Sequence, residues 1–484
     1  MPASRWITTA ERGCLTILFV WLALLPLPFG SIVEHARFPL IAVPLFLCGA
    51  AVALRLEAAR SRLEDALPPR AWLYWVAGGF LFVGVCALQL IPLPASLHQT
   101  LSPESYRIWS AASRIAALAG VPVAVWHPLT VDPAATAFEL FRMAGLLGAF
   151  CAAALLIRSH GRRVILAAVI CAAALFEAMY GLREAALERY EIWGWVNRLI
   201  FNRVTGTFVN PNHFAHYMAI VMPMPLFLVA VAWRNSGTPD LPFARRIAAL
   251  MEQRLFRTMF ACIVAVLCLA SVLLAQSRGA LLSMMAGVLG VAALLPGERR
   301  RRIALMSFAV MALIAGLVMF LGPERTVRRF VPNQVERETF VGRRIGISAA
   351  AHIFRRFPIA GSGAGTFERV VSLEQDPAVE NIFHHAHNDY AEIAATMGAA
   401  GASIAFIALL AGYVALVRMT FGRNAEGLSW RRRAFQAAAL ASLTIAMVHA
   451  LFDFNFFIPS NPATLAAIAG AAMAGTYQDK RTRR

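Results

Sequence analysis

Two apolar blocks separated by a short polar turn decide the fold class. Residues 258–275 read TMFACIVAVLCLASVLLA, residues 279–296 read GALLSMMAGVLGVAALLP, and only Gln276, Ser277 and Arg278 lie between them. A helix of about 20 predominantly apolar residues spans the hydrocarbon core of a bilayer. The two blocks therefore predict a hairpin of two membrane-spanning helices.

The rest of the chain repeats this pattern. Of its 484 residues, 59% are hydrophobic and 15% are charged, whereas about 25% of a soluble domain is charged. We predict an all-α polytopic membrane protein, with one integral membrane domain over 1–484. The twelve expected spans are 13–32, 38–54, 72–91, 135–157, 164–183, 211–232, 258–275, 279–296, 303–321, 397–417, 434–452 and 461–476. The fourth is the least typical, because it contains Glu139 and Arg142.

The arginines predict the orientation of these spans. Basic residues gather in alternate connections, at 55–70, 158–163, 234–257, 299–302 and 418–433, and again in the tail 480–484. Cytoplasmic loops are enriched in Lys and Arg, so both termini are expected on the cytoplasmic side. The net charge of +18 is then a topology signal, and we expect no nucleic-acid partner.

Three outward segments remain, at 92–134, 184–210 and 322–396. The last is a large outward loop between the ninth and tenth spans. Loops longer than about 12–15 residues are usually functional or disordered. Because this one mixes Pro, Gly, aromatic and charged residues, we expect a folded cap of short helices.

The large loop ends in a histidine-rich segment. His384, His385 and His387 are followed by Asn388, Asp389 and Tyr390, directly before an apolar helix. A metal site could use His384, His387 and Asp389, but the spacing is not diagnostic of one. Histidine accepts a proton near neutral pH, as a base that activates a hydroxyl must. All seven cysteines lie in apolar blocks without metal-ligand spacing, so neither a disulfide nor zinc is expected.

Arginines on the outward face are the second candidate group. Arg203 precedes the sixth span and Asn212 begins it, Arg278 lies in the turn between the seventh and eighth, and Arg343 and Arg344 lie in the large loop. Any one of them could extend to lipid headgroups. A charge at the edge of the hydrocarbon is nevertheless costly and usually functional.

Two further elements have simpler interpretations. The glycine-rich run 361–367 lacks the Lys-Ser/Thr ending of a phosphate loop, so it is expected to form a turn that packs closely on a helix. Asp453 follows the eleventh span and is expected at a helix end. Guanidinium groups bind phosphate oxygens in bidentate fashion. Arginines and histidines on one face thus favour a lipid-linked diphosphate as substrate.

The ordered motifs of residues 200–400 resemble those of the O-antigen ligase family, also called the Wzy C-terminal domain family. They are the segments 203–208, 210–215, 276–279, 342–343, 358–367 and 387–401. The ligase signature is His, then Asn, Ser or Gln, nine residues, Gly, two residues, and Gly, Thr or Tyr. His387, Asn388, Gly398 and Gly401 fit it in full.

This resemblance implies a GT-C-like membrane glycosyltransferase that needs no metal or other cofactor. Such an enzyme moves a glycan from undecaprenyl diphosphate to lipid A-core at the periplasmic face. His387 matches the family's essential histidine, which activates the acceptor. Arg203, Arg278 and, in the large loop, Arg343 or its neighbour Arg344 match arginines that bind diphosphate. Supporting roles are expected for Asn212, His384, Asn388, Asp389, Tyr390 and Asp453. The family usually has an aromatic residue a few positions after the loop arginine. This sequence lacks it, and Ser348 lies near the corresponding position.

Other functions remain open from the sequence. A polymerase would extend the glycan on its lipid carrier, and a protein O-oligosaccharyltransferase would attach it to protein hydroxyls. Both use the same donor. A lipid-linked glycan transporter belongs to a different class of protein. Internal repeats with broken helices in both halves of the chain would favour that interpretation. The sequence shows no such symmetry, and its charged candidates lie on one face.

Overall fold

The computed structural model describes residues 2–60, 71–196, 203–234, 243–294, 298, 334–372, 384–422 and 428–475. Within them, eight helices are long and apolar enough to cross a membrane. The predicted all-α polytopic fold is therefore confirmed. The helices that correspond to expected spans are α1 (Pro2–Leu24), α2 (Glu34–Arg60), α3 (Ala71–Leu90), α6 (Pro133–Leu156), α7 (His160–Ala186), α8 (Pro211–Val221), α9 (Pro223–Arg234), α10 (Phe243–Leu274), α11 (Arg278–Leu294), α16 (Asp389–Phe421), α17 (Trp430–His449) and α18 (Ser460–Met473).

Several helix boundaries differ from the expected ones. The first span is shifted, since α1 covers Pro2–Leu24 instead of 13–32, and the seventh begins at Phe243 instead of residue 258. The second span is longer than predicted, since α2 runs over 27 residues. The sixth span is divided into α8 and α9 at Pro223, because proline cannot donate the helical hydrogen bond. The tenth begins at Asp389 instead of residue 397. The expected ninth span, 303–321, lies outside the described residues.

The polar pair in the fourth span is satisfied within the protein. Arg142 donates to the carboxylate of Glu139 one turn earlier on α6 and to the carbonyl oxygen of Phe456 at 2.8 Å. Its guanidinium also lies over the Phe456 ring, 5.0 Å from the ring centroid, within the distance of about 6 Å at which a cation is attracted to an aromatic face. Both charged side chains are buried. A buried ion pair with further hydrogen bonds is tolerated inside a bundle, so α6 spans despite its charges.

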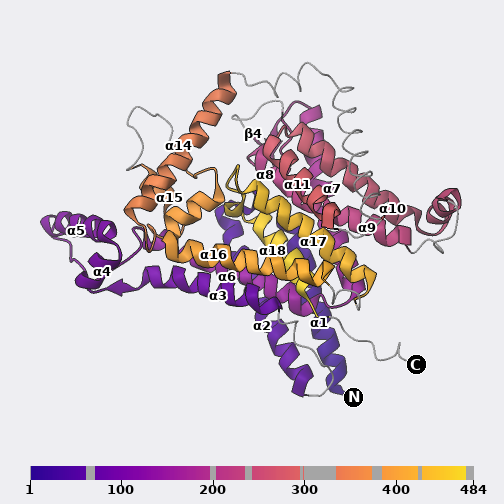
Figure 1. The fold of residues 1–484 in the computed structure, drawn as a ribbon, viewed down its shortest axis with the longest axis horizontal. Coiled ribbons are helices and arrows are strands. Elements are labelled where there is room, and N and C mark those ends of the chain that lie inside the picture. Colours follow the sequence, from indigo (N-terminus) through magenta and orange to yellow (C-terminus); the bar gives the residue numbers. More distant parts are fainter. Residues whose placement is uncertain are drawn as a thin grey trace.

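Helices α3, α6 and α16 run side by side along the length of the molecule (Figure 1). The connections between spans hold smaller elements. They are η1 (Phe29–Ser31), β1 (Pro92–Leu93), α4 (Ala95–Leu101), α5 (Pro103–Leu118), β2 (His127–Pro128), β3 (Glu191–Ile192), β4 (Trp195–Val196), α14 (Gln334–Arg356), α15 (Phe367–Val371) and η3 (Asn455–Phe457). Strands β1 and β2 pair antiparallel, as do β3 and β4.

The described part of the large loop is folded, but the expectation of only short helices is wrong. Helix α14 has 23 residues, and α15 has five. Ile353 and Phe357 of α14 pack with Phe367 of α15 and with Ala395 of α16 in a small buried core. This core exists because α14 presents one apolar face, and it fixes the loop on the start of α16.

The glycine-rich run forms the expected close-packed turn. Gly361 and Gly398 both have positive φ angles, of 74° and 62°. A Cβ atom on Gly398 would lie 2.4 Å from the amide nitrogen of Gly361, so only glycine allows the two segments to approach so closely. The amide of Gly363 donates to the carbonyl of Thr396, and Gln89 accepts from Ala364. These amides are used for packing and do not form a phosphate cradle.

Candidate active site at one end of the bundle

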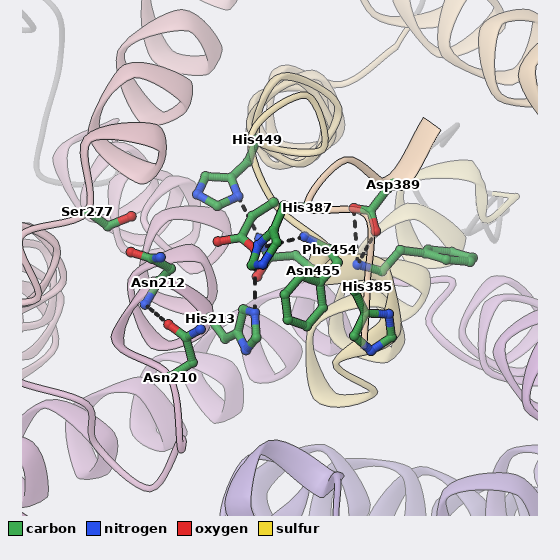
Figure 2. A network of polar contacts seen from close by, with 12 residues as sticks. Asn210, Asn212, His213, Ser277, His385, His387, Asp389, His449, Phe454 and Asn455 are labelled. Atoms are coloured by element: carbon green, nitrogen blue, oxygen red, sulfur yellow. Dashed lines mark hydrogen bonds and ion pairs between the residues drawn. The ribbon is translucent and has the colours of Figure 1, made fainter. Parts of the chain in front are cut away.

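His387 lies at the centre of a polar cluster between the large loop and the end of α17. Its Nδ1 atom is 3.3 Å from Oδ1 of Asp453, and its ring packs edge-on against Phe454 (Figure 2). The φ angle of His387 is 53°, an uncommon conformation for a residue other than glycine. Backbone strain of this kind persists only where the surroundings hold it, often at functional sites. The side chain is 28% exposed, so its ring remains accessible.

Asp453 joins three side chains from three separate segments. Besides His387, His213 of α8 approaches its Oδ1 atom at 3.8 Å, and Arg343 of α14 approaches Oδ2 at 3.9 Å. The carboxylate is buried, and burial alone would raise its pKa. The neighbouring His213, His387 and Arg343 side chains, of which His387 is within hydrogen-bond distance, instead hold the pKa of Asp453 well below its usual range. A permanent negative charge thus lies beside His387.

The residues after His387 fix the segment to the end of α17. Asn388 caps α16 by accepting from the amide of Ala391, and its Nδ2 atom donates to Leu451. Both carboxylate oxygens of Asp389 accept from the amide of Phe456 at 3.2 Å. Tyr390 donates its hydroxyl to the carbonyl of Met447. These three residues hold the histidine segment in place and do not face its imidazole ring.

The other two histidines of the segment have different surroundings. His385 bonds Glu392 at 2.8 Å and stacks on Phe454, with ring centroids 4.2 Å apart. Burial opposes its protonation, but the nearby Glu392 carboxylate outweighs burial and raises the pKa of His385. His384 is exposed and pairs with Glu368. His384, His387 and Asp389 thus each have a different partner. Among the described residues, no group of three His, Cys, Asp or Glu side chains is arranged to hold a metal ion.

Arg203 is fixed next to the same cluster. Its Nε atom donates to the carbonyl of Ala275 at 2.8 Å, and a terminal nitrogen donates to Asn212 at 3.1 Å. Asn212 precedes His213 in the first turn of α8, where Asn210 caps the helix. Arg203 is therefore connected through α8 to the residue that faces Asp453.

The turn that holds Arg278 also lies here. Arg278 is exposed at the first position of α11, directly after Ser277, whose hydroxyl accepts from the amide of Ala280. A Cβ atom on Gly279 would lie 3.2 Å from Nε2 of His449, at the end of α17. Figure 2 shows Ser277 and Asn212 on one side of the cluster and His387 beyond them. The segments of Arg203, Arg278 and His387 are thus neighbours.

The two adjacent loop arginines are separated by helix geometry. Arg343 approaches Asp453, whereas Arg344 is exposed. Successive residues of a helix point about 100° apart, so only one of them can face the cluster. The structure places Arg343 there.

Sequence reasoning did not single out several residues of this cluster. Two of them are His213 and Phe454. Their positions in the sequence could have indicated them, since His213 lies inside the motif 210–215 and Phe454 directly follows Asp453. His449 bonds Asn455, which in turn accepts from Asn461 of α18. No local pattern indicates that these residues meet, because they come from α8, α17, η3 and α18.

Comparison with known proteins gives one family. No curated protein matches the chain. A family model described as O-antigen ligase matches residues 263–406. That segment contains Arg278, Arg343 and the complete signature from His387 to Gly401, while Arg203, His213 and Asp453 lie on either side of it. The match agrees with the family that the ordered motifs predict: residues 263–406 of this membrane protein are similar to the O-antigen ligase domain.

Proposed function

We propose that the protein is a metal-independent glycosyltransferase of the bacterial inner membrane that moves a glycan from undecaprenyl diphosphate to an acceptor hydroxyl at the periplasmic face. The observation that supports this most is the buried Asp453, which lies between His387 and Arg343 and beside the helix that holds Arg203. A base and cationic groups then adjoin one site, as the transfer reaction requires.

His387 is the proposed base. The Asp453 carboxylate accepts a hydrogen bond from Nδ1–H, so Nε2 keeps a lone pair for the acceptor hydroxyl. As Nε2 takes the hydroxyl proton, the acceptor oxygen forms a bond to the anomeric carbon of the donor glycan. The bond from that carbon to the diphosphate oxygen breaks, and the diphosphate leaves with the electron pair. Asp453 stabilises the imidazolium ion that forms.

Arginines are proposed to bind the departing diphosphate. Arg203 is held by Ala275 and Asn212, and Arg278 begins the helix that follows the same turn. Arg343 lies on α14 of the large loop, beside Asp453, and is proposed to contact the diphosphate from that side. Arg344 is exposed on the same helix and is proposed to contact the diphosphate or the glycan from solvent. Guanidinium groups fixed before the reaction stabilise charge that develops on the leaving group. Lipid A-core is the proposed acceptor, as in a ligase, with a growing glycan on a second lipid carrier as the alternative for a polymerase.

Reconstitution tests the proposal. We expect the purified protein in liposomes to transfer glycan from undecaprenyl diphosphate when lipid A-core is present, at the same rate with and without EDTA. Gel analysis of the products separates the acceptors: glycosylated core indicates a ligase, and lengthened lipid-linked glycan indicates a polymerase. Absence of transfer to either acceptor contradicts the proposed reaction. Loss of transfer in EDTA contradicts metal independence.

A further inference from the structure

A cavity of about 300 Å³ lies among α3, α6, α16, α17 and α18, and it is partly open to the surroundings. Helix α16 lines it with residues on both sides of its break at Gly398, from Asp389 to Ile393 and from Ala405 to Leu409. Trp75 and Phe150 line it away from the active site, whereas Asp389 and Asn455 line the end beside the site. Its mostly apolar lining suits a hydrocarbon chain whose polar head lies at the end beside the site.

The cavity and the candidate diphosphate arginines lie on opposite faces of α17. Leu443, Met447 and Ala450 of α17 line the cavity. Positions 441, 445, 449 and 452 approach α11 instead, because Cβ atoms on Gly287 and Gly279 would touch them. At 100° per residue these two sets point in roughly opposite directions. Arg278 begins α11, so a lipid whose diphosphate lies at Arg278 has α17 between its head and the cavity.

The end of the cavity beside the site is polar but not cationic. Of the described residues that line it, none is Arg or Lys, so it does not suit a phosphate group. His216 and Asn461 line it and are almost fully buried, and Nδ1 of His216 and Oδ1 of Asn461 have no hydrogen-bond partner. Buried polar atoms are nearly always paired in folded proteins. Two such atoms beside one cavity point to an uncharged polar group of a ligand.

We infer that this cavity binds the hydrocarbon chain of a lipid-linked acceptor, on the side of α17 opposite the donor diphosphate. The inference rests on the proposed transfer reaction. His387 and Asp453 lie near the end of α17 between the two sides, which places the acceptor head next to the base. The chain belongs either to an acyl chain of lipid A-core or to the isoprenoid chain of a second lipid-linked glycan. Both are apolar chains with a polar saccharide head.

The experiment fills the cavity and compares acceptors with and without a lipid. Ala466 of α18 lines the cavity, and Ala466→Phe would occupy part of it. Ala77→Phe is the control, because Ala77 is exposed on α3 and does not line the cavity. Each protein, in liposomes with one donor, receives lipid A-core, an undecaprenyl-diphosphate glycan, or the lipid-free saccharide of either. We expect Ala466→Phe to lower kcat/KM for the true lipid-linked acceptor about tenfold. The phenyl ring would keep about two methylene groups of the acceptor chain from being buried, which corresponds to about this factor. Transfer to the lipid-free saccharide should not change.

Each other outcome contradicts the inference. An equal fall for lipid-linked and lipid-free acceptors would mean that the cavity serves the donor. Equal kinetics of Ala466→Phe and wild type for every acceptor would mean that no substrate chain enters. The same lipids with a diazirine in the chain give a readout independent of transfer. Photolabelling of α3, α16 or α18 that Ala466→Phe removes and Ala77→Phe keeps supports the chain site even if wild type transfers no glycan. No labelling of these helices contradicts it.

Discussion

Replacing His387 with alanine is expected to lower kcat about 10²- to 10⁴-fold, the range that one positioned base contributes, while the protein still inserts and folds. His387 is partly exposed and contacts Asp453 and Phe454, so its removal leaves the apolar core intact. The measurement is single-turnover transfer in liposomes at saturating donor. The fold is checked by gel filtration and thermal unfolding in detergent.

His352→Ala is the matched control for this variant. His352 lies exposed on α14 of the same loop, and its loss should leave kcat within about twofold of wild type, as for a surface change away from the site. Retention of wild-type kcat by a well-folded His387→Ala protein would refute the assignment of the base. An equal loss in both variants would mean that the loop as a whole, and not this imidazole, was damaged.

Asp453→Asn is expected to lower kcat about 10³-fold, because an amide removes the negative charge that stabilises the imidazolium and no longer requires a proton on Nδ1 of His387. It should also leave donor KM nearly unchanged if Arg203 and Arg278 bind the diphosphate. Steady-state kinetics with varied donor give both values. A fall in donor affinity with unchanged kcat would assign Asp453 to donor binding instead.

The same variant carries a pH signature. The native pKa of Asp453 lies well below its usual value, which is about 3.9 in an unfolded chain. The carboxylate therefore stabilises the folded state above about pH 4, and this contribution is lost as pH falls through the native pKa. Thermal unfolding from pH 7 to pH 3 should show wild type more stable than Asp453→Asn at pH 7, with a gap that narrows below about pH 4. A gap that widens on acidification would contradict the assigned ion pairs.

The sequence was most informative where chemistry is local. Apolar length predicted the apolar helices of eleven expected spans, though not α14 of the large loop. Gly398 was part of a recognised motif whose physical basis is its positive φ angle beside Gly361. Helix starts were less accurate. Helix α16 begins at Asp389, directly after the capping residue Asn388 and eight residues before the predicted start at residue 397. The cap and the break at Gly398 let a short polar stretch form the first turns of the helix.

The assembly of the site could not be predicted in the same way. Asp453 was expected at a helix end and in a supporting role, but its burial against His387, which lies 66 residues earlier in the chain, was not predicted. His213 reaches it from a third segment. Which of Arg343 and Arg344 faces the cluster depends on the phase of α14, which a single sequence does not fix. Tertiary packing, not local pattern, determines these contacts.

A structure of the protein with bound undecaprenyl diphosphate, determined by electron cryomicroscopy in nanodiscs, tests the central claim most directly. We predict that the diphosphate lies between the guanidinium groups of Arg203 and Arg278, on the α11 side of α17, with the imidazole of His387 facing the bridging oxygen to the glycan. Density for the diphosphate away from these arginines, or across the membrane from His387, would contradict the account.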